Sequence, residues 1–287
     1  MYNCQIVKYP HGYQVRLYDM PHDLPPPPDD KLTLERLSEL DLLSRETRAY
    51  LRDPERIFEM DQWEIDLEME NMVAQEQRSL RSSMGRTVNK VYYLSRSNDW
   101  EWFFTLTFNP EVVDSFDYTA CTEKLSNWFT VMRRSCPNMK YIVVPEQHKS
   151  GRWHFHGLFA DCDNLGFVDS GKKTKDGDTI YNVGKYRLGW STATKVKDPR
   201  RVTKYIGKYI TKDLCAVTKG KKRYWSSRNL AEAEIEKKYY PPEDLPLLLD
   251  QLQDMAISVT SCTSEGLGKT FYIELSEDWK DEENDTI

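Results

Sequence analysis

Residues 139–160 read MKYIVVPEQHKSGRWHFHGLFA, and this stretch determines how the central part of the chain folds. Two runs rich in β-branched and aromatic residues flank the short segment Lys149-Ser150-Gly151, which is typical of a β-hairpin. A three-residue hairpin loop favours a type I turn followed by a left-handed residue, and Gly151 occupies that third position. The segment therefore predicts a hairpin with a three-residue loop.

The register of this hairpin decides which side chains share a face. With a three-residue loop, Glu146 lies opposite His154, and His156 is the next residue on the same face. A two-residue loop would send Glu146 to the other face. Two imidazoles, one carboxylate and open positions suit a divalent ion such as Mg²⁺ or Mn²⁺ acting on a phosphate. The competing interpretation is that the two histidines are half-buried structural residues.

Further elements extend the hairpin into a domain. The run WEWFFTLTF, residues 100–108, is a strand pattern that Asn109-Pro110 ends, and residues 118–135 have helical periodicity. Another strand pattern starts at Thr179, and a helix is expected from about Arg200 to Asp213. The order of elements predicts an α+β fold with a largely antiparallel sheet.

The run TKYIGKYITK, residues 203–212, repeats Tyr-Ile-x-Lys. On one helix, Tyr205 and Tyr209 would lie one turn apart on the same face. A phenol is a poor nucleophile until it is deprotonated, and neighbouring lysines favour phenolate and hold a phosphodiester. An isolated Tyr-x-x-Lys is more often an ordinary surface helix. The lysines predicted to form an adjacent stripe are Lys204, Lys208 and Lys212.

The charge of the chain is unevenly distributed. The net charge is −6, but both flanking segments are acidic. Residues 29–78 carry 15 acidic and 7 basic side chains, and residues 231–287 carry 15 acidic and 4 basic side chains. Residues 172–223 carry 16 basic and 4 acidic side chains. Basic residues interleaved with aromatic ones favour a single-stranded nucleic acid partner over a merely solvated face. The aromatic residues in question are Tyr181, Tyr186, Trp190, Tyr205, Tyr209, Tyr224 and Trp225.

Several function classes are excluded by simple patterns. No apolar run approaches the roughly 20 residues of a membrane helix, and the first residues lack the apolar core of a secretory signal. The six cysteines are scattered, which indicates reduced thiols and a cytoplasmic protein. The run SEGLGKTFYIEL is not a phosphate loop, because Thr263 stands where the first glycine is needed and a strand-like run follows Lys269.

Four segments are expected along the chain. Residues 1–30 form an N-terminal arm and a Pro-rich spacer, since DLPPPPDD is an extended sequence. Residues 31–89 form a helical accessory region of two or more helices, broken near Asp53-Pro54. The catalytic domain spans residues 90–228, and residues 229–287 form an acidic C-terminal region of helix and loop.

Three runs in order resemble the motifs of the HUH endonucleases: FFTLTF, WHFHGLF and KYIGKYITK, in residues 103–212. Within that superfamily the chain is similar to rolling-circle replication initiator (Rep) proteins of single-stranded DNA phages, the microvirus type especially, and of related plasmids. The resemblance implies an antiparallel sheet of about five strands with flanking helices. It also implies that Glu146, His154 and His156 are metal ligands and that Thr105 and Thr107 lie near the DNA.

The resemblance further implies a mechanism. A tyrosine attacks the scissile phosphate of a single-stranded origin, leaving a 5′-phosphotyrosine and a 3′-OH that primes a host polymerase. A second tyrosine then cuts the regenerated origin, and a host helicase is needed because no helicase follows the nuclease. The protein would act in the host cytoplasm. The alternatives are a relaxase or transposase of the same superfamily, or a non-catalytic regulator that binds single-stranded DNA.

Overall fold

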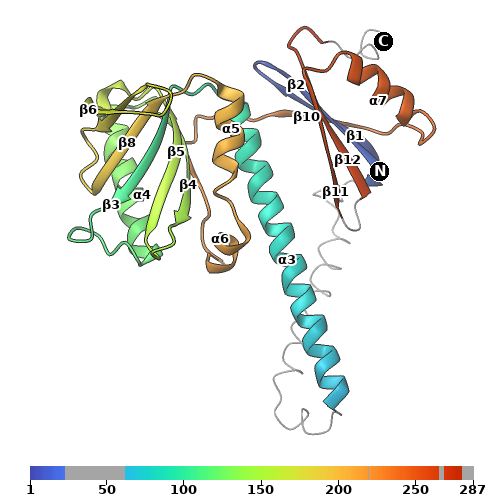
Figure 1. Ribbon diagram of the computed structural model, residues 1–287, viewed down its shortest axis with the longest axis horizontal. Coiled ribbons are helices and arrows are strands. Elements are labelled where there is room, and N and C mark those ends of the chain that lie inside the picture. The colour runs from blue at the N-terminus through green and yellow to red at the C-terminus, as the bar shows by residue number, and fades with distance from the viewer. Residues whose placement is uncertain (23–61, 219, 265–267, 280–287) are drawn as a thin grey trace. The chain divides into compact units, whose positions relative to one another are not determined.

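The computed structural model describes residues 1–22, 62–218, 220–264 and 268–279. These residues form an α+β structure with antiparallel sheets and several helices, so the expected fold class is confirmed (Figure 1). They divide into two compact units. Unit 1 comprises Met1–Ile6, Gln14–Ser79 and Glu236–Ser276, and unit 2 comprises Val7–Tyr13, Leu80–Ile235 and Glu277–Ile287.

A five-stranded sheet in the order β10-β1-β2-β12-β11 joins strands from distant parts of the sequence. The sequence analysis did not predict β1 and β2, because buried polar side chains such as Gln5 and Gln14 interrupt their apolar pattern. Gln14 Nε2 donates to Glu274 Oε1 at 2.7 Å, which satisfies both buried groups. The elements are β1 (Tyr2–Tyr9), β2 (Gly12–His22), β10 (Glu234–Lys238), α7 (Leu245–Asp254), β11 (Ser258–Ser264) and β12 (Gly268–Leu275).

A seven-stranded sheet in the order β6-β7-β8-β3-β5-β4-β9 forms the centre of unit 2, where about five strands were expected. The hairpin of β6 and β7 and the two-residue strand β9 enlarge it at its edges. The strands are β3 (Trp102–Phe108), β4 (Lys140–Gln147), β5 (Trp153–Ala160), β6 (Phe167–Lys173), β7 (Thr179–Val183), β8 (Gly189–Lys195) and β9 (Trp225–Ser226).

The hairpin of β4 and β5 has the predicted register. Glu146 is the pairing partner of His154. The His148 amide donates to the Arg152 carbonyl at 2.8 Å, which closes the loop. Gly151 has a φ of 85°, the left-handed conformation that the loop length requires. The loop chemistry thus places the carboxylate and the imidazole on one face.

One face of this sheet is covered by α4 (Tyr118–Ser135), the helix predicted from periodicity. The Asp117 side chain caps its start by accepting from the Thr119 amide. Side chains at alternate positions of β3 and β5 pack with this helix in one core. Among them are Phe104, Phe108, Phe155 and Phe159, and α4 contributes Leu125 and Phe129.

The opposite face of the sheet is divided into a packed half and an open half. In the packed half, Leu158 and Ile142 join Ile206 in a second core, to which Val91 of α3 (Gln62–Arg96) also belongs. In the open half, the alternating side chains of β3 are half-buried and polar, as at Thr107. Figure 1 shows α5 and α6 beside the β4 side of the sheet. The open half carries the residues of the candidate site.

The prediction of one helix from about Arg200 to Asp213 is wrong, because the structure has two helices there. α5 (Pro199–Gly207) ends between the two tyrosines, and α6 (Lys212–Val217) begins after a turn. Gly207 costs a helix about 1 kcal/mol relative to alanine. Thr211 adopts an extended conformation and its hydroxyl caps α6 by accepting from the Leu214 amide. The two signals together end α5 before Tyr209.

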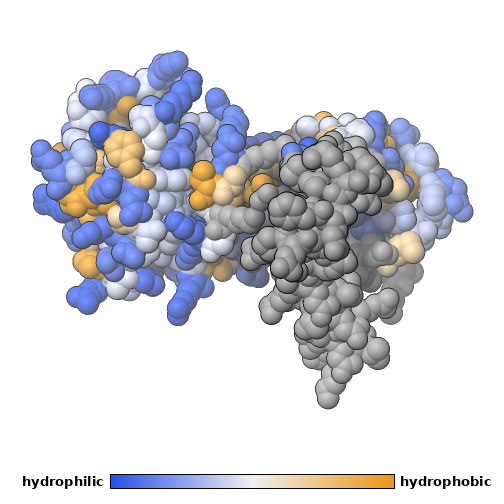
Figure 2. Space-filling model, turned by 90° about the horizontal axis from the view of Figure 1, so that it is seen from below, coloured by the Kyte–Doolittle hydropathy of each residue, from blue (hydrophilic) through white to orange (hydrophobic). Residues whose placement is uncertain are grey.

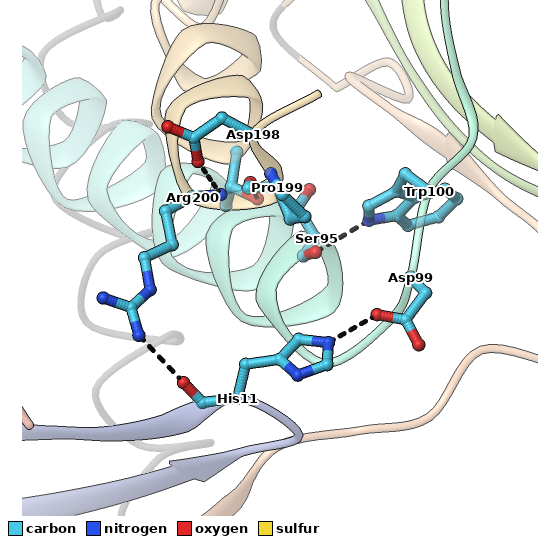
Figure 3. Close-up of polar contacts among 8 residues, drawn as sticks. His11, Ser95, Asp99, Trp100, Asp198, Pro199 and Arg200 are labelled. Atoms are coloured by element: carbon cyan, nitrogen blue, oxygen red, sulfur yellow. Dashed lines mark hydrogen bonds and ion pairs between the residues drawn. The ribbon is translucent and has the colours of Figure 1, made fainter. Parts of the chain in front are cut away.

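The start of α5 is fixed by polar contacts within unit 2. The Asp198 carboxylate accepts from the amides of Arg200 and Arg201, and Pro199 occupies the first turn (Figure 3). The Arg200 guanidinium donates to the His11 carbonyl at 3.1 Å, and the His11 ring pairs with Asp99 at 2.8 Å. The Asp198 cap fixes the residue at which α5 begins, and therefore the face of the helix on which Tyr205 lies.

The structure also bears on the expectations for the cysteines, for a phosphate loop and for membrane helices. All six cysteines are among the described residues and are free, and five of them are buried, as reduced structural thiols should be. Lys269 lies in the strand β12, which agrees with the rejection of a phosphate loop. Within the described ranges, none of the helices combines the length and apolarity needed to cross a membrane.

Hydrophilic side chains dominate much of the face drawn in Figure 2. The segment boundaries expected from the sequence stay a prediction, and Asp53-Pro54 lies outside the described residues.

Candidate nuclease site

Strand pairing arranges the candidate residues in two rows across the open half of the sheet. Thr107 of β3 pairs with His154 on one side and with Trp190 of β8 on the other. The second row lies two residues further along each strand. The first row is Trp190, Thr107, His154 and Glu146, and the second is Thr192, Thr105, His156 and Val144.

His156 is held by hydrogen bonds to both of its ring nitrogens. Its Nδ1 lies 3.1 Å from Thr105 Oγ1, and its Nε2 lies 2.7 Å from Glu146 Oε2. Because an ionised carboxylate only accepts, the neutral ring carries its proton on Nε2 and accepts from the threonine at Nδ1. Burial lowers the pKa of His156, and the adjacent Glu146 carboxylate opposes that shift. The ring is therefore oriented and kept neutral near neutral pH.

His154 lies on the same face in a more open position. Its Nδ1 is 3.3 Å from Thr107 Oγ1, the counterpart of the contact between Thr105 and His156. Its ring centroid lies 5.5 Å from that of His148, which the sequence analysis did not assign to the site. Burial, followed by the nearby His148, lowers the pKa of His154. Both threonines thus orient histidine rings, a role that the sequence pattern alone did not indicate.

The two tyrosines meet this face in different ways. The Tyr209 ring lies parallel to the His156 ring, with centroids 3.8 Å apart and planes 7° apart. The Tyr205 ring contacts Tyr209 edge to face at 5.5 Å and Phe103 at 5.4 Å. Tyr205 is 43% exposed, whereas burial, the Tyr205 hydroxyl and Glu146 raise the pKa of Tyr209. The two phenols are neighbours in unequal surroundings.

The lysines do not form the single stripe expected from one helix. Lys208 follows α5, and its Nζ lies 5.4 Å from the centre of the Tyr205 ring. Lys204 is exposed on the last turn of α5. Lys212 begins α6, and its side chain lies outside the described part of the structure. Of the two lysines whose side chains the structure describes, Lys208 is the one that contacts a candidate nucleophile.

The donor atoms fit a divalent ion in kind but are not gathered around one point. The Nδ1 atoms of both imidazoles contact threonine hydroxyls, which orients the rings, and Glu146 supplies a carboxylate. The Nε2 of His156 bonds that carboxylate, so this nitrogen would have to lose its proton to coordinate a metal ion. Among the described residues, however, no group of three or more His, Cys, Asp or Glu side chains is arranged to hold a metal ion. Metal binding by Glu146, His154 and His156 therefore stays a prediction.

Residues 101–214 match a family model of replication-associated proteins, the ORF2 type. This match supports a Rep-type replication protein. It extends from β3 into the first half of α6 and includes the two histidines, Glu146 and both tyrosines. No curated protein and no solved structure matched the chain.

The basic segment, residues 172–223, is less rich in exposed aromatic rings than its sequence suggested. Tyr186 and Trp225 are buried in the core under α4. Of the seven aromatic residues interleaved with the lysines and arginines, only Trp190 and Tyr205 belong to the exposed class. The position of Trp190 beside Thr107 was missed, because the pairing of β3 with β8 spans many residues and has no local signal.

Proposed function

We propose that this protein nicks and rejoins single-stranded DNA at a rolling-circle origin. The observation that carries the proposal is the stacking of Tyr209 on His156, since it brings a phenol to the face where Glu146 and His154 also lie. The match of residues 101–214 to a replication-associated family supports the same activity. The substrate class follows from the basic segment that surrounds the tyrosines.

The proposed reaction conserves the energy of the bond that it breaks. A tyrosine oxygen attacks the scissile phosphorus and gives up its proton. The bond from phosphorus to the 3′-oxygen breaks, and that oxygen leaves as a 3′-OH after it takes up a proton. The 5′-phosphate remains linked to the tyrosine. Attack by a 3′-OH on this phosphotyrosine reverses the step and rejoins the strand without ATP.

The chain's own residues orient the reacting groups. Thr105 and Thr107 hold the imidazole rings of His156 and His154, and Glu146 lies against His156. These side chains would hold the divalent ion that the chemistry calls for. When bound, Mg²⁺ or Mn²⁺ would polarise a phosphate oxygen and stabilise the charge that develops on it.

Two neighbouring phenols suit a reaction with two cuts. Tyr205 and Tyr209 contact each other, so one can hold the 5′-phosphate while the other attacks the regenerated origin. Lys208, whose ammonium group lies beside the Tyr205 ring, attracts the phosphodiester. Lys204 contributes a further exposed charge close to the same helix end.

At the finer level we propose a rolling-circle initiator of the HUH endonuclease superfamily, similar to those of microviruses and related plasmids. A host helicase would open the duplex and a host polymerase would extend the 3′-OH, both in the host cytoplasm. A relaxase or transposase of the superfamily would make the same covalent adduct on other DNA. A non-catalytic regulator would bind single strands without making one.

A single-turnover experiment tests this function and does not require the origin sequence to be known. The full-length protein is mixed with labelled single-stranded oligonucleotides that tile the replicon carrying its gene, in Mn²⁺ or in EDTA. We expect one oligonucleotide to give a covalent adduct on a denaturing gel, in Mn²⁺ only. Absence of an adduct on every oligonucleotide would refute nicking, and binding without an adduct would support the regulator.

A further inference from the structure

Trp190 is the most exposed of the large hydrophobic residues around the candidate site, at 62%. Tryptophan is usually well buried, because its indole is the largest apolar side chain. Within the described residues, no ring, cation or hydrogen-bond contact engages the Trp190 side chain. It lies in the first row of the open half, next to Thr107 and two strands from His154. An exposed indole in this position requires an explanation.

The backbone that carries Trp190 is held tightly. A Cβ on the preceding residue, Gly189, would lie 2.2 Å from the Thr107 carbonyl oxygen and 2.4 Å from the Asn109 nitrogen. The Asn109 amide donates to the Leu188 carbonyl at 2.9 Å. Because β8 approaches the end of β3 so closely, the backbone at Trp190 has a fixed position. Because this backbone is already fixed, stacking of a ligand on the ring costs no additional backbone entropy.

The surroundings of Trp190 favour a nucleic acid strand over a protein partner. Its neighbours across and along the strands are the polar residues Thr107 and Thr192, not an apolar patch of the kind that docks proteins. The exposed residues Lys185 and Arg187 lie in the connection that leads to β8. Strand spacings of about 4.8 Å place the Trp190 backbone about 10 Å from that of His154, within a few nucleotides of a phosphate bound there.

We propose that Trp190 is a stacking platform for an unpaired base of the single-stranded DNA, close to the scissile phosphate. This inference rests on the proposed function, because that function places a single strand across the open half of the sheet. Indole rings stack on any base, so Trp190 positions the strand without reading its sequence. It touches no reacting atom and is a positioning residue.

The test measures binding alone and needs neither cleavage nor metal. Fluorescein-labelled dT20 is titrated with the full-length protein in EDTA, and its fluorescence anisotropy is followed. Trp190→Ala should weaken binding about 5- to 100-fold, the loss expected for one stacked base. Trp190→Phe, which keeps an aromatic face, should stay within about threefold of the wild type. Tyr239→Ala, which removes an exposed aromatic residue of unit 1, should leave the affinity unchanged.

The salt dependence separates stacking from a charge contact. In Trp190→Ala the slope of log K against log salt should equal that of the wild type, because no phosphate contact is lost. Equal affinities of wild type and Trp190→Ala, equal losses in Trp190→Ala and Trp190→Phe, or a slope changed by about one would each overturn the platform. If the wild type itself does not bind dT20, the proposed function fails as well. If the wild type binds dT20 but forms no adduct on any origin strand, nicking is refuted, whereas base stacking on Trp190 is still supported by the affinity loss in Trp190→Ala.

Discussion

The rings of Tyr209 and His156 lie face to face, with centroids 3.8 Å apart. The contact joins the turn after α5 to the strand β5. Ile206 and Ile210 are buried on either side of Tyr209 and anchor that turn in the core. Tyr205, one turn earlier, is exposed and contacts the same ring from its edge. The end of α5 therefore presents two phenols in different environments, one stacked on His156 and the other in contact with the first.

The two tyrosines should substitute for each other in adduct formation. Tyr205→Phe and Tyr209→Phe each remove one hydroxyl while keeping the ring contacts, so each variant should retain some covalent adduct on the origin strand. The double variant should retain none, because no phenol then lies beside the candidate ligands. Quantifying adduct on denaturing gels, with the oligonucleotide in excess, measures all three.

Tyr186→Phe is the matched control for these variants. Tyr186 is a buried tyrosine of the same unit, and within the described residues its hydroxyl has no hydrogen-bond partner. Removal of this unpaired buried hydroxyl should not lower the stability of the protein and should not change the adduct yield. Should Tyr205→Phe or Tyr209→Phe alone eliminate every adduct, the enzyme uses one tyrosine and the other is a packing residue.

Removal of the metal ion should stop the reaction, and binding of the ion should depend on His154 and His156. EDTA should abolish the adduct, and Mn²⁺ added in excess should restore it. The double variant His154→Ala and His156→Ala should lose Mn²⁺ binding in calorimetry as well as adduct formation, because both imidazole donors are gone. His11→Ala, at an exposed histidine outside the site, should bind Mn²⁺ like the wild type. An adduct that persists in the double variant would refute the metal assignment.

Thr105 should affect metal affinity without being a ligand. Thr105→Val keeps the shape of the side chain but removes the hydroxyl 3.1 Å from His156 Nδ1. Loss of such a supporting contact typically lowers metal affinity or activity by 10- to 100-fold. Thr192→Val, at the exposed position that pairs with Thr105 on β8, is the control and should have little effect. Equal Mn²⁺ affinities of the two variants would show that the hydroxyl does not orient the ring.

Gly189→Ala should destabilise unit 2. The added methyl group would overlap the backbone of β3 at 2.2 Å, and backbone cannot move aside as a flexible side chain can. We expect the free energy of unfolding to fall by about 1–3 kcal/mol. Gly85→Ala, in the interior of α3 with nothing within 4 Å of the new methyl group, should be neutral or stabilising by up to about 1 kcal/mol. Urea denaturation of both variants measures the difference, and equal stabilities would contradict the close approach of β8 to β3.

Local signals explain what could be predicted from the sequence. The loop at Gly151 set the hairpin register, and with it the shared face of Glu146 and His154. Helical periodicity predicted α4 over residues 118–135, the bounds that the structure shows. These features depend on a few neighbouring residues, and the hydrophobic pattern agrees with the turn chemistry.

Long-range pairing explains what the sequence did not indicate. Nothing near Trp190 shows that it pairs with Thr107, and nothing near Asn3 shows that its side chain bonds the Tyr240 backbone. The break between Tyr205 and Tyr209 had a local signal in Gly207 and the Thr211 cap, but the regular spacing of the tyrosines outweighed it in the prediction. Side-chain contacts across strands become visible only once the sheet order is known.

The sheet order of unit 1 also has a consequence for synthesis on the ribosome. Its strands β1 and β2 pair with β10 and β12, so they cannot complete their sheet until residues 268–275 have emerged. Most of unit 2 is one continuous stretch, Leu80–Ile235, which leaves the ribosome earlier. Because domains fold as units while the chain grows, unit 2 folds first, and the sheet that contains the earliest residues is the last to form.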